Sequence, residues 1–190
     1  MAKPIEESSQ VFPKDPMDKK LLLASIKKYK PEGMHLGVEK VSKLYKTSFG
    51  KWQMTVQVCI TEEDIKTLQY ELDENAQYIL VEDELGDEKK KVKVADGHLA
   101  MATLFMNVSV DEEIDEADEE TEFKVYPTSG TYPLFKAALQ ESGDLPDDMK
   151  RVAFITNAGE VTEALEGFEF VGKVGKSNGK FKFEFLDVVQ

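Results

Sequence analysis

The stretch GKVGKSNGKFKFEFLDVV, residues 172–189, decides the fold that the sequence predicts. In its second half aromatic rings alternate with charged side chains, as in a strand with one buried face. The rings are Phe181, Phe183 and Phe185, and the charged residues are Lys180, Lys182 and Glu184. Asn178-Gly179 supplies the positive backbone angles of a tight turn, so the stretch predicts a hairpin. The rings are either core or a surface that stacks on a ligand, and the one-sided row favours core.

Outward from this hairpin, short strands separated by turn residues are predicted along most of the chain. They are residues 34–38, 52–60, 78–84, 90–95, 98–110, 123–126, 151–156 and 168–174. The clearest is 52–60, in which Trp52, Met54 and Val56 begin an apolar face and polar residues occupy the other. We expect 78–84 and 90–95 to pair as a second hairpin.

Few helices interrupt these strands. We expect helices at 18–29, ended by Lys30-Pro31, and at 62–72, where Thr61 to Asp64 has the spacing of a capping box. A third begins after Thr131 and ends at Gly143, and 161–167 is at most a short helix. The pattern predicts a mostly β protein, with an antiparallel sheet closed into a small barrel or sandwich. Residues 1–30 form a polar lead with a short helix, and 31–190 form the domain.

The composition is that of a protein with an ordinary core. Of the 190 residues 41% are hydrophobic, and the single cysteine, Cys59, excludes an internal disulfide. The N-terminal residues lack the apolar run of a signal peptide, and no stretch resembles a membrane span. We expect a soluble cytoplasmic protein with no membrane partner.

Acidic charge is concentrated in DEEIDEADEETE, residues 111–122. These nine carboxylates account for most of the formal net charge of −13, which would be −4 without them. Such a segment repels itself and predicts a poorly ordered acidic loop. It either keeps the protein soluble or screens a basic face until a partner displaces it.

Catalytic and metal-binding patterns are weak. Cys59 has only His35 and His98 as imidazole partners, and these three residues are too few for a zinc site. The sequence around Cys59 also matches no known signature of a nucleophilic cysteine. The glycines of 172–177 lack the spacing of a phosphate-binding loop. We expect no enzyme activity, no metal and no cofactor.

Two stretches interleave bases with aromatic residues, as proteins that bind single-stranded nucleic acid do. The first contributes Lys43, Tyr45, Lys46, Lys51 and Trp52, and the second contributes Lys173, Lys176, Lys180 and Lys182. In a ligand complex the rings would stack on bases and the lysines would follow the phosphates.

Residues 123–188 carry a family resemblance. The runs FKVYPTSGTYPLFKAALQESG, VTEALEGFEFVGKV and GKFKFEFLDV resemble the C-terminal part of OB-fold proteins from phage and archaeal replication modules. The resemblance implies an antiparallel OB-like β-barrel with a helix at one end and single-stranded DNA bound on the open face. An acidic segment in such proteins docks other replication proteins, although here it is internal. The leading hypothesis is therefore a non-enzymatic single-stranded DNA-binding protein for replication or recombination. The alternative is a protein-interaction or assembly module that docks through its acidic loop.

Overall fold

The computed structural model describes residues 23–24, 26–61, 64, 70–72, 78–80, 100–111, 113–177 and 180–189. They belong to two compact units, each assembled from separated stretches of chain. The first unit draws on 1–37, 58–102 and 169–190, and the second on 38–57 and 103–168.

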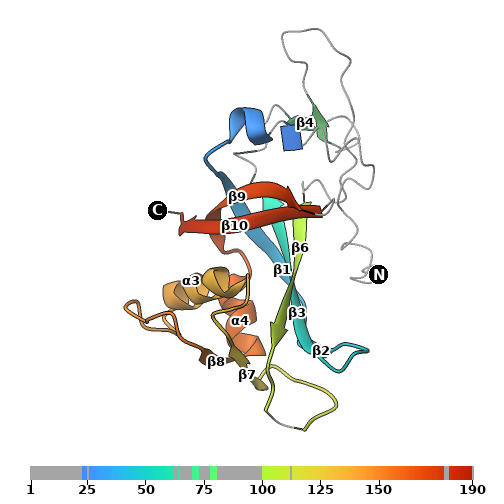
Figure 1. Ribbon diagram of the computed structural model, residues 1–190, viewed down its shortest axis with the longest axis vertical. Coiled ribbons are helices and arrows are strands. Elements are labelled where there is room, and N and C mark those ends of the chain that lie inside the picture. Colours follow the sequence, from blue (N-terminus) through green and yellow to red (C-terminus); the bar gives the residue numbers. More distant parts are fainter. Residues whose placement is uncertain are drawn as a thin grey trace. The chain divides into compact units, whose positions relative to one another are not determined.

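The main sheet has six strands in the order β10-β9-β1-β3-β2, with β6 beside β3 (Figure 1). The bounds are β1 Met34–Val41, β2 Tyr45–Lys46, β3 Trp52–Ile60, β6 Ala100–Val108, β9 Glu169–Ser177 and β10 Lys180–Val188. Two-stranded sheets pair β4 (Tyr70–Leu72) with β5 (Tyr78–Leu80), and β7 (Glu122–Val125) with β8 (Phe154–Asn157). The predicted mostly antiparallel β architecture is confirmed. The ladders between described strands do not close into a barrel, so the barrel stays a prediction.

Strand β3 follows the alternation that the sequence predicts. Trp52, Met54 and Val56 are buried, as are Val58 and Ile60, while Gln53 and its polar neighbours on the other face are half-buried. Cys59 is also buried, in agreement with a structural cysteine.

In the first unit β9 and β10 form the predicted antiparallel hairpin, with Phe183 opposite Val174. The ring of Phe170 on β9 is fully buried and lies 5.6 Å from that of Phe183 and 5.8 Å from that of Phe185. Both β10 rings are half-buried, so they border the core instead of filling it. At Gly172 a Cβ atom would lie 2.8 Å from Leu36 Cδ1, so any other residue would require the Leu36 side chain to shift.

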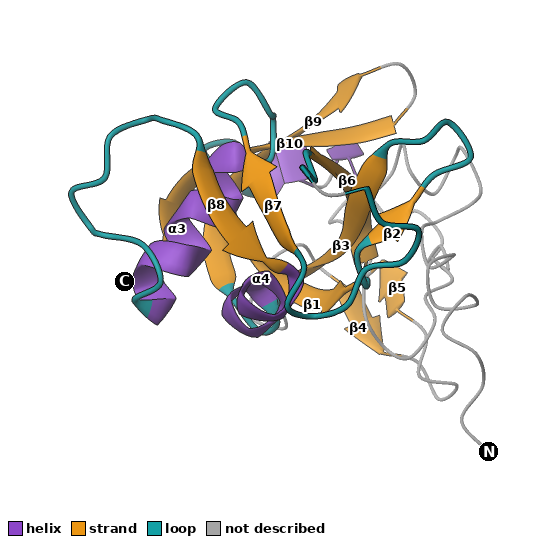
Figure 2. Cartoon of the chain, turned by 90° about the horizontal axis from the view of Figure 1, so that it is seen from below, coloured by secondary structure: helices purple, strands orange, loops and turns teal. Residues whose placement is uncertain are grey.

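In the second unit two helices pack with β7 and β8 (Figure 2). Helix α3 (Tyr132–Ser142) ends at Gly143, whose φ of 89° is left-handed, as predicted. Thr131 is its N-cap residue but makes no capping bond, because its hydroxyl is hydrogen-bonded to Ser129. Helix α4 (Ala158–Leu165) begins three residues before the predicted 161, at a capping box of Asn157 and Glu160.

Three other predictions lie partly outside the described residues. The helix predicted for 62–72 is wrong at its end, because Tyr70–Leu72 is strand β4; Asp64 is helical, and the other residues between 62 and 69 lie outside the described part. Tyr78–Leu80 is a strand as predicted and pairs with β4, while its predicted pairing with 90–95 falls outside the described residues. The helix predicted for 18–29 ends as expected, with the amide of Lys30 donating to Ile26 O at 2.8 Å.

The acidic segment is not a free arm along its whole length. Thr121 and Asp118 form a compact turn, in which the Asp118 amide donates to Thr121 Oγ1 at 3.0 Å. The amide of Gly159 at the start of α4 donates to Glu119 O at 2.9 Å, and Glu122 begins β7. The prediction of poor order therefore does not hold for residues 118–122, which make hydrogen bonds with one another and with other parts of the second unit.

Candidate nucleic-acid interface

The first predicted set of site residues lies on the hairpin of β2 and β3 in the second unit. Tyr45 pairs with Gln53 and Lys46 with Trp52. The turn is closed by the Thr47 amide, which donates to Lys51 O at 2.8 Å, and by the Lys51 amide, which donates to Thr47 Oγ1 at 3.1 Å. Gly50 has a φ of 76°, which a side chain would disfavour, and this bend leaves Phe49 at the tip.

Phe49 is the most exposed large apolar side chain in the described part of the chain, at 91%. Lys46 and Lys51 flank it in sequence, and both are exposed, as is Lys43 before β2. A ring held in water at a hairpin tip has no packing role in its own unit. Its exposure and its basic neighbours are what a base-stacking site requires.

Trp52 is the predicted site residue that is most buried in this set. It is only 7% exposed and belongs to the apolar face of β3. Lys46 Nζ lies 5.6 Å from the centre of its ring, a cation–π distance. Trp52 therefore lies beside Lys46 and forms part of the core, with 7% of its surface left exposed.

A chain of polar groups crosses the outer face from β2 to β6. Tyr45 Oη donates to Gln53 Oε1 at 2.6 Å, and Gln53 Nε2 donates to Asn107 Oδ1 at 3.0 Å. Partial burial raises the pKa of the Tyr45 hydroxyl above its ordinary value, so the hydroxyl is protonated and a donor at neutral pH. Phe105, two residues before Asn107 on the same face of β6, is 59% exposed. The outer face thus offers the fixed amide groups of Gln53 and Asn107 beside the exposed rings of Tyr45 and Phe105.

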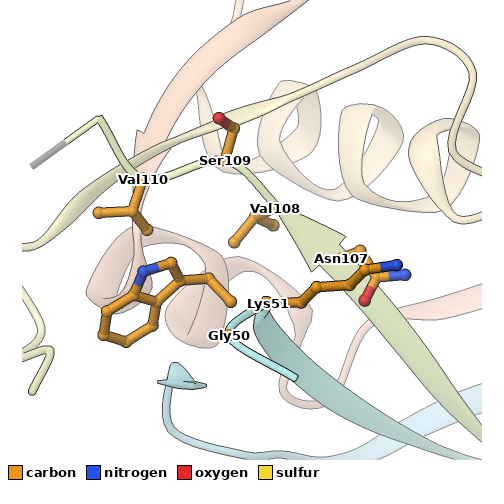
Figure 3. A pocket seen from close by; sticks show the side chains of 7 residues that line it. Gly50, Lys51, Asn107, Val108, Ser109 and Val110 are labelled. Atoms are coloured by element: carbon orange, nitrogen blue, oxygen red, sulfur yellow. The ribbon is translucent and has the colours of Figure 1, made fainter. Parts of the chain in front are cut away.

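An open cavity of about 410 Å³ adjoins the hairpin (Figure 3). It is lined by Gly50, Lys51, Trp52, Asn107, Val108, Ser109 and Val110. In Figure 3 Lys51 and Asn107 lie at one end in this view and Val110 at the other. The volume is at the lower end of the range for ligand pockets, and the lining combines apolar walls with one cationic and two polar side chains.

The second predicted set lies on β9 and β10 in the first unit. Lys173 and Lys182 are exposed, as predicted, and the side chains of Lys176 and Lys180 lie outside the described residues. Glu184 is exposed directly opposite Lys173, so the charge of this lysine is partly balanced across the ladder. The surface has mixed charge, unlike the hairpin of β2 and β3. The two sets belong to different units.

Sequence reasoning missed Phe49, Phe105, Gln53 and Asn107 as site residues. The signal for Phe105 and Asn107 was present in the alternation of 98–110, since Met106 between them is fully buried. The role of Gln53 depends on pairing between strands distant in sequence, which alternation alone does not reveal.

Metal-binding side chains do not gather in the described residues. No group of three or more histidine, cysteine or acidic side chains there could hold a metal ion. Cys59 is buried on β3, His35 is half-buried on β1, and His98 lies outside the described part. Nor does any described helix have the length and apolar character to cross a membrane.

Comparisons with known proteins leave the family open. No protein-family model, curated protein or solved structure matches the chain. The geometry of the hairpin and its neighbouring strand therefore carries the functional argument.

Proposed function

We propose that this chain is a non-enzymatic single-stranded DNA-binding protein of the replication or recombination type, and that DNA lies on the outer face of β2, β3 and β6. We call this the hairpin surface: Lys43, Tyr45, Lys46, Phe49, Lys51 and Phe105. The observation that carries the proposal is the exposed ring of Phe49 between two exposed lysines.

The hairpin surface supplies both interactions that single strands need. Stacking of a base on an aromatic ring contributes about 1–3 kcal/mol, whatever the base. The three lysines can neutralise phosphates along the strand, which adds affinity without sequence preference. The amide groups of Gln53 and Asn107 hold the floor of the surface in place, which lowers the entropy lost on binding.

The proposal also includes an OB-like fold and a cytoplasmic location. The antiparallel sheet with few helices is compatible with an OB-like barrel, in which an open face of strands binds single strands. A cytoplasmic location fits the single free thiol of Cys59, which is buried on β3.

The test is binding of a fluorescently labelled single-stranded oligonucleotide, followed by anisotropy at several salt concentrations. With three lysine contacts the logarithm of affinity should fall with the logarithm of salt at a slope of about −2. Phe49→Ala should weaken binding about tenfold, and Lys51→Gln should weaken it and flatten the slope.

Matched controls come from the same unit. Ile155→Ala removes another apolar side chain, 60% exposed on β8, and Lys150→Gln removes another exposed lysine. Both controls should bind as the parent does. Absence of binding at low salt, or equal losses in the controls and the hairpin variants, would remove the hairpin surface as a DNA site.

A second candidate function is docking of a basic partner on the acidic segment. The turn at Asp118 and the bond from Gly159 to Glu119 favour it, because they hold one end of the segment while Asp115 and Glu116 stay exposed. Calorimetry with a lysine-rich peptide tests this candidate. Binding that is lost in the Asp115→Asn, Glu116→Gln variant supports docking, and no heat of binding by the parent contradicts it.

A further inference from the structure

Strand β10 lies at one end of the main sheet. Among the described strands it pairs only with β9, and its ladder is regular from Lys180 to Phe185. After Phe185 the register shifts, and Asp187 pairs with Val171. The other edge of the regular part thus presents main-chain groups that no described strand uses, and such an edge can accept a further strand.

The side chains of this edge leave apolar surface in water. Phe183 and Phe185 are only half-buried on the inner face, although both contact the buried ring of Phe170. Leu186, at the register shift, is 43% exposed. A strand added beside β10 would cover part of this surface.

The charge pattern of β10 is self-complementary in a single register. In an antiparallel pair related by a two-fold axis through the sheet, residues on the same face come opposite each other. With the axis at Phe183, Lys182 of each copy is opposite Glu184 of the other. Opposite charges in such positions stabilise a sheet, and like charges destabilise it.

Other registers lose this match. An axis at Lys182 or at Glu184 puts that residue opposite its own copy, which pairs like charges. An axis at Phe181 puts Lys180 opposite Lys182 twice, and an axis at Phe185 leaves Glu184 opposite Leu186. Only the axis at Phe183 gives opposite charges without a like-charged pair.

We propose that β10 is a dimerisation edge, at which a second copy of this chain adds its own β10 antiparallel with the two-fold axis at Phe183. Lys182 and Glu184 then set the register, and the half-buried rings of the two copies become covered. The proposal does not depend on DNA binding.

The test measures association of the full chain by sedimentation over a range of concentrations. The parent should form dimers as concentration rises. Lys182→Glu and Glu184→Lys should each weaken dimerisation about tenfold or more, because each turns two attractive pairs into two repulsive ones. Lys27→Glu and Glu163→Lys make the same charge changes at exposed helical positions that are not part of β10, and they should leave dimerisation unchanged.

Mixing the two β10 variants gives the sharper result. One copy then carries glutamate at 182 and 184 and the other carries lysine at both, so every cross-strand pair is again opposite in charge. We expect a mixed dimer to form at concentrations where each variant alone is monomeric. A parent that stays monomeric at hundreds of micromolar, variants that dimerise like the parent, or a mixture that stays monomeric would each overturn the proposal.

Discussion

Asp64 provides the sharpest test of how the first unit is held together. Its carboxylate is buried, at 3% exposure, and Oδ1 lies 2.7 Å from Lys30 Nζ. Oδ2 accepts a hydrogen bond from the backbone amide of His35, at the start of β1. One side chain therefore joins the end of the N-terminal helical turn to the first strand. Asp64→Ala should remove both links.

The expected cost follows from the exposure of the two partners. Removing one member of a buried ion pair costs about 3–5 kcal/mol. The Lys30 side chain is 25% exposed, so water can recover part of its solvation, and the larger share of the loss comes from the amide of His35. We expect Asp64→Ala to lower the free energy of unfolding by about 2–4 kcal/mol. Asp64→Asn keeps an acceptor for the amide and should cost about half as much.

Urea unfolding of the parent and variants measures these differences directly. Asp148→Ala, which removes an exposed carboxylate in the second unit, serves as the control and should change stability by less than about 0.5 kcal/mol. If Asp64→Ala were as mild as this control, the bonds to Lys30 and His35 would not be stabilising. If Asp64→Asn were as costly as Asp64→Ala, the charge and not the hydrogen bond would carry the effect.

The remaining predictions concern the hairpin of β9 and β10 and the acidic segment. Phe170→Ala should cost about 3–5 kcal/mol in urea unfolding and Phe183→Ala about 1–2.5, because only the first ring is fully buried; equal costs would contradict this difference. Gly172→Ala should destabilise by about 1–3 kcal/mol, since its Cβ would meet a β1 side chain at 2.8 Å, while Gly175→Ala, with 3.9 Å to the nearest atom, should cost less; the reverse order would refute the packing argument. Deleting 112–117 should leave the melting temperature nearly unchanged, whereas deleting 111–122 should lower it, because the second deletion removes the turn and the start of β7. Equal melting temperatures for the two deletions would show that this anchoring is not stabilising.

The sequence predicts those features of the fold that depend on neighbouring residues. The alternation from Trp52 to Ile60 appears as β3, and the stop signal at Gly143 ends α3. The alternation of β10 also holds for the described side chains, with Lys182 and Glu184 exposed. Each of these features depends on the period of a strand or on a local backbone angle, which a single stretch of sequence records.

Long-range contacts account for the errors. Asp64 has the spacing of a capping box, yet its carboxylate bonds to Lys30 and to the amide of His35, which is 29 residues away. The spacing of a capping box describes only neighbouring residues, so it cannot predict that Asp64 is buried against a lysine from a distant part of the chain. The capping box of Asn157 and Glu160 is local in sequence but was not predicted, so α4 begins three residues before the predicted 161.

The candidate site was predictable in its charges and less so in its rings. Lys43, Lys46 and Lys51 are exposed as expected, because lysine is seldom buried. Trp52 follows the apolar face of β3 and is buried, whereas Phe49, which was not predicted as a site residue, lies in the turn, where no alternation applies. Which aromatic residue of a basic stretch faces water is decided by the register of the hairpin.

The formal net charge of −13 and a phosphate-binding surface are compatible because of the distance over which charges act. At an ionic strength near 0.1 M, exposed charges separated by more than about 10 Å are largely screened. A phosphate at Lys51 therefore responds mainly to the groups around the hairpin, and distant carboxylates contribute little. The acidic segment is the exception, because Asp111 directly follows Val110, which lines the same cavity as Lys51. The first carboxylates of the segment are thus placed to repel a polyanion at this surface. This repulsion relates the two candidate functions, because a basic partner that neutralises the segment would remove a repulsive charge from the edge of the DNA site.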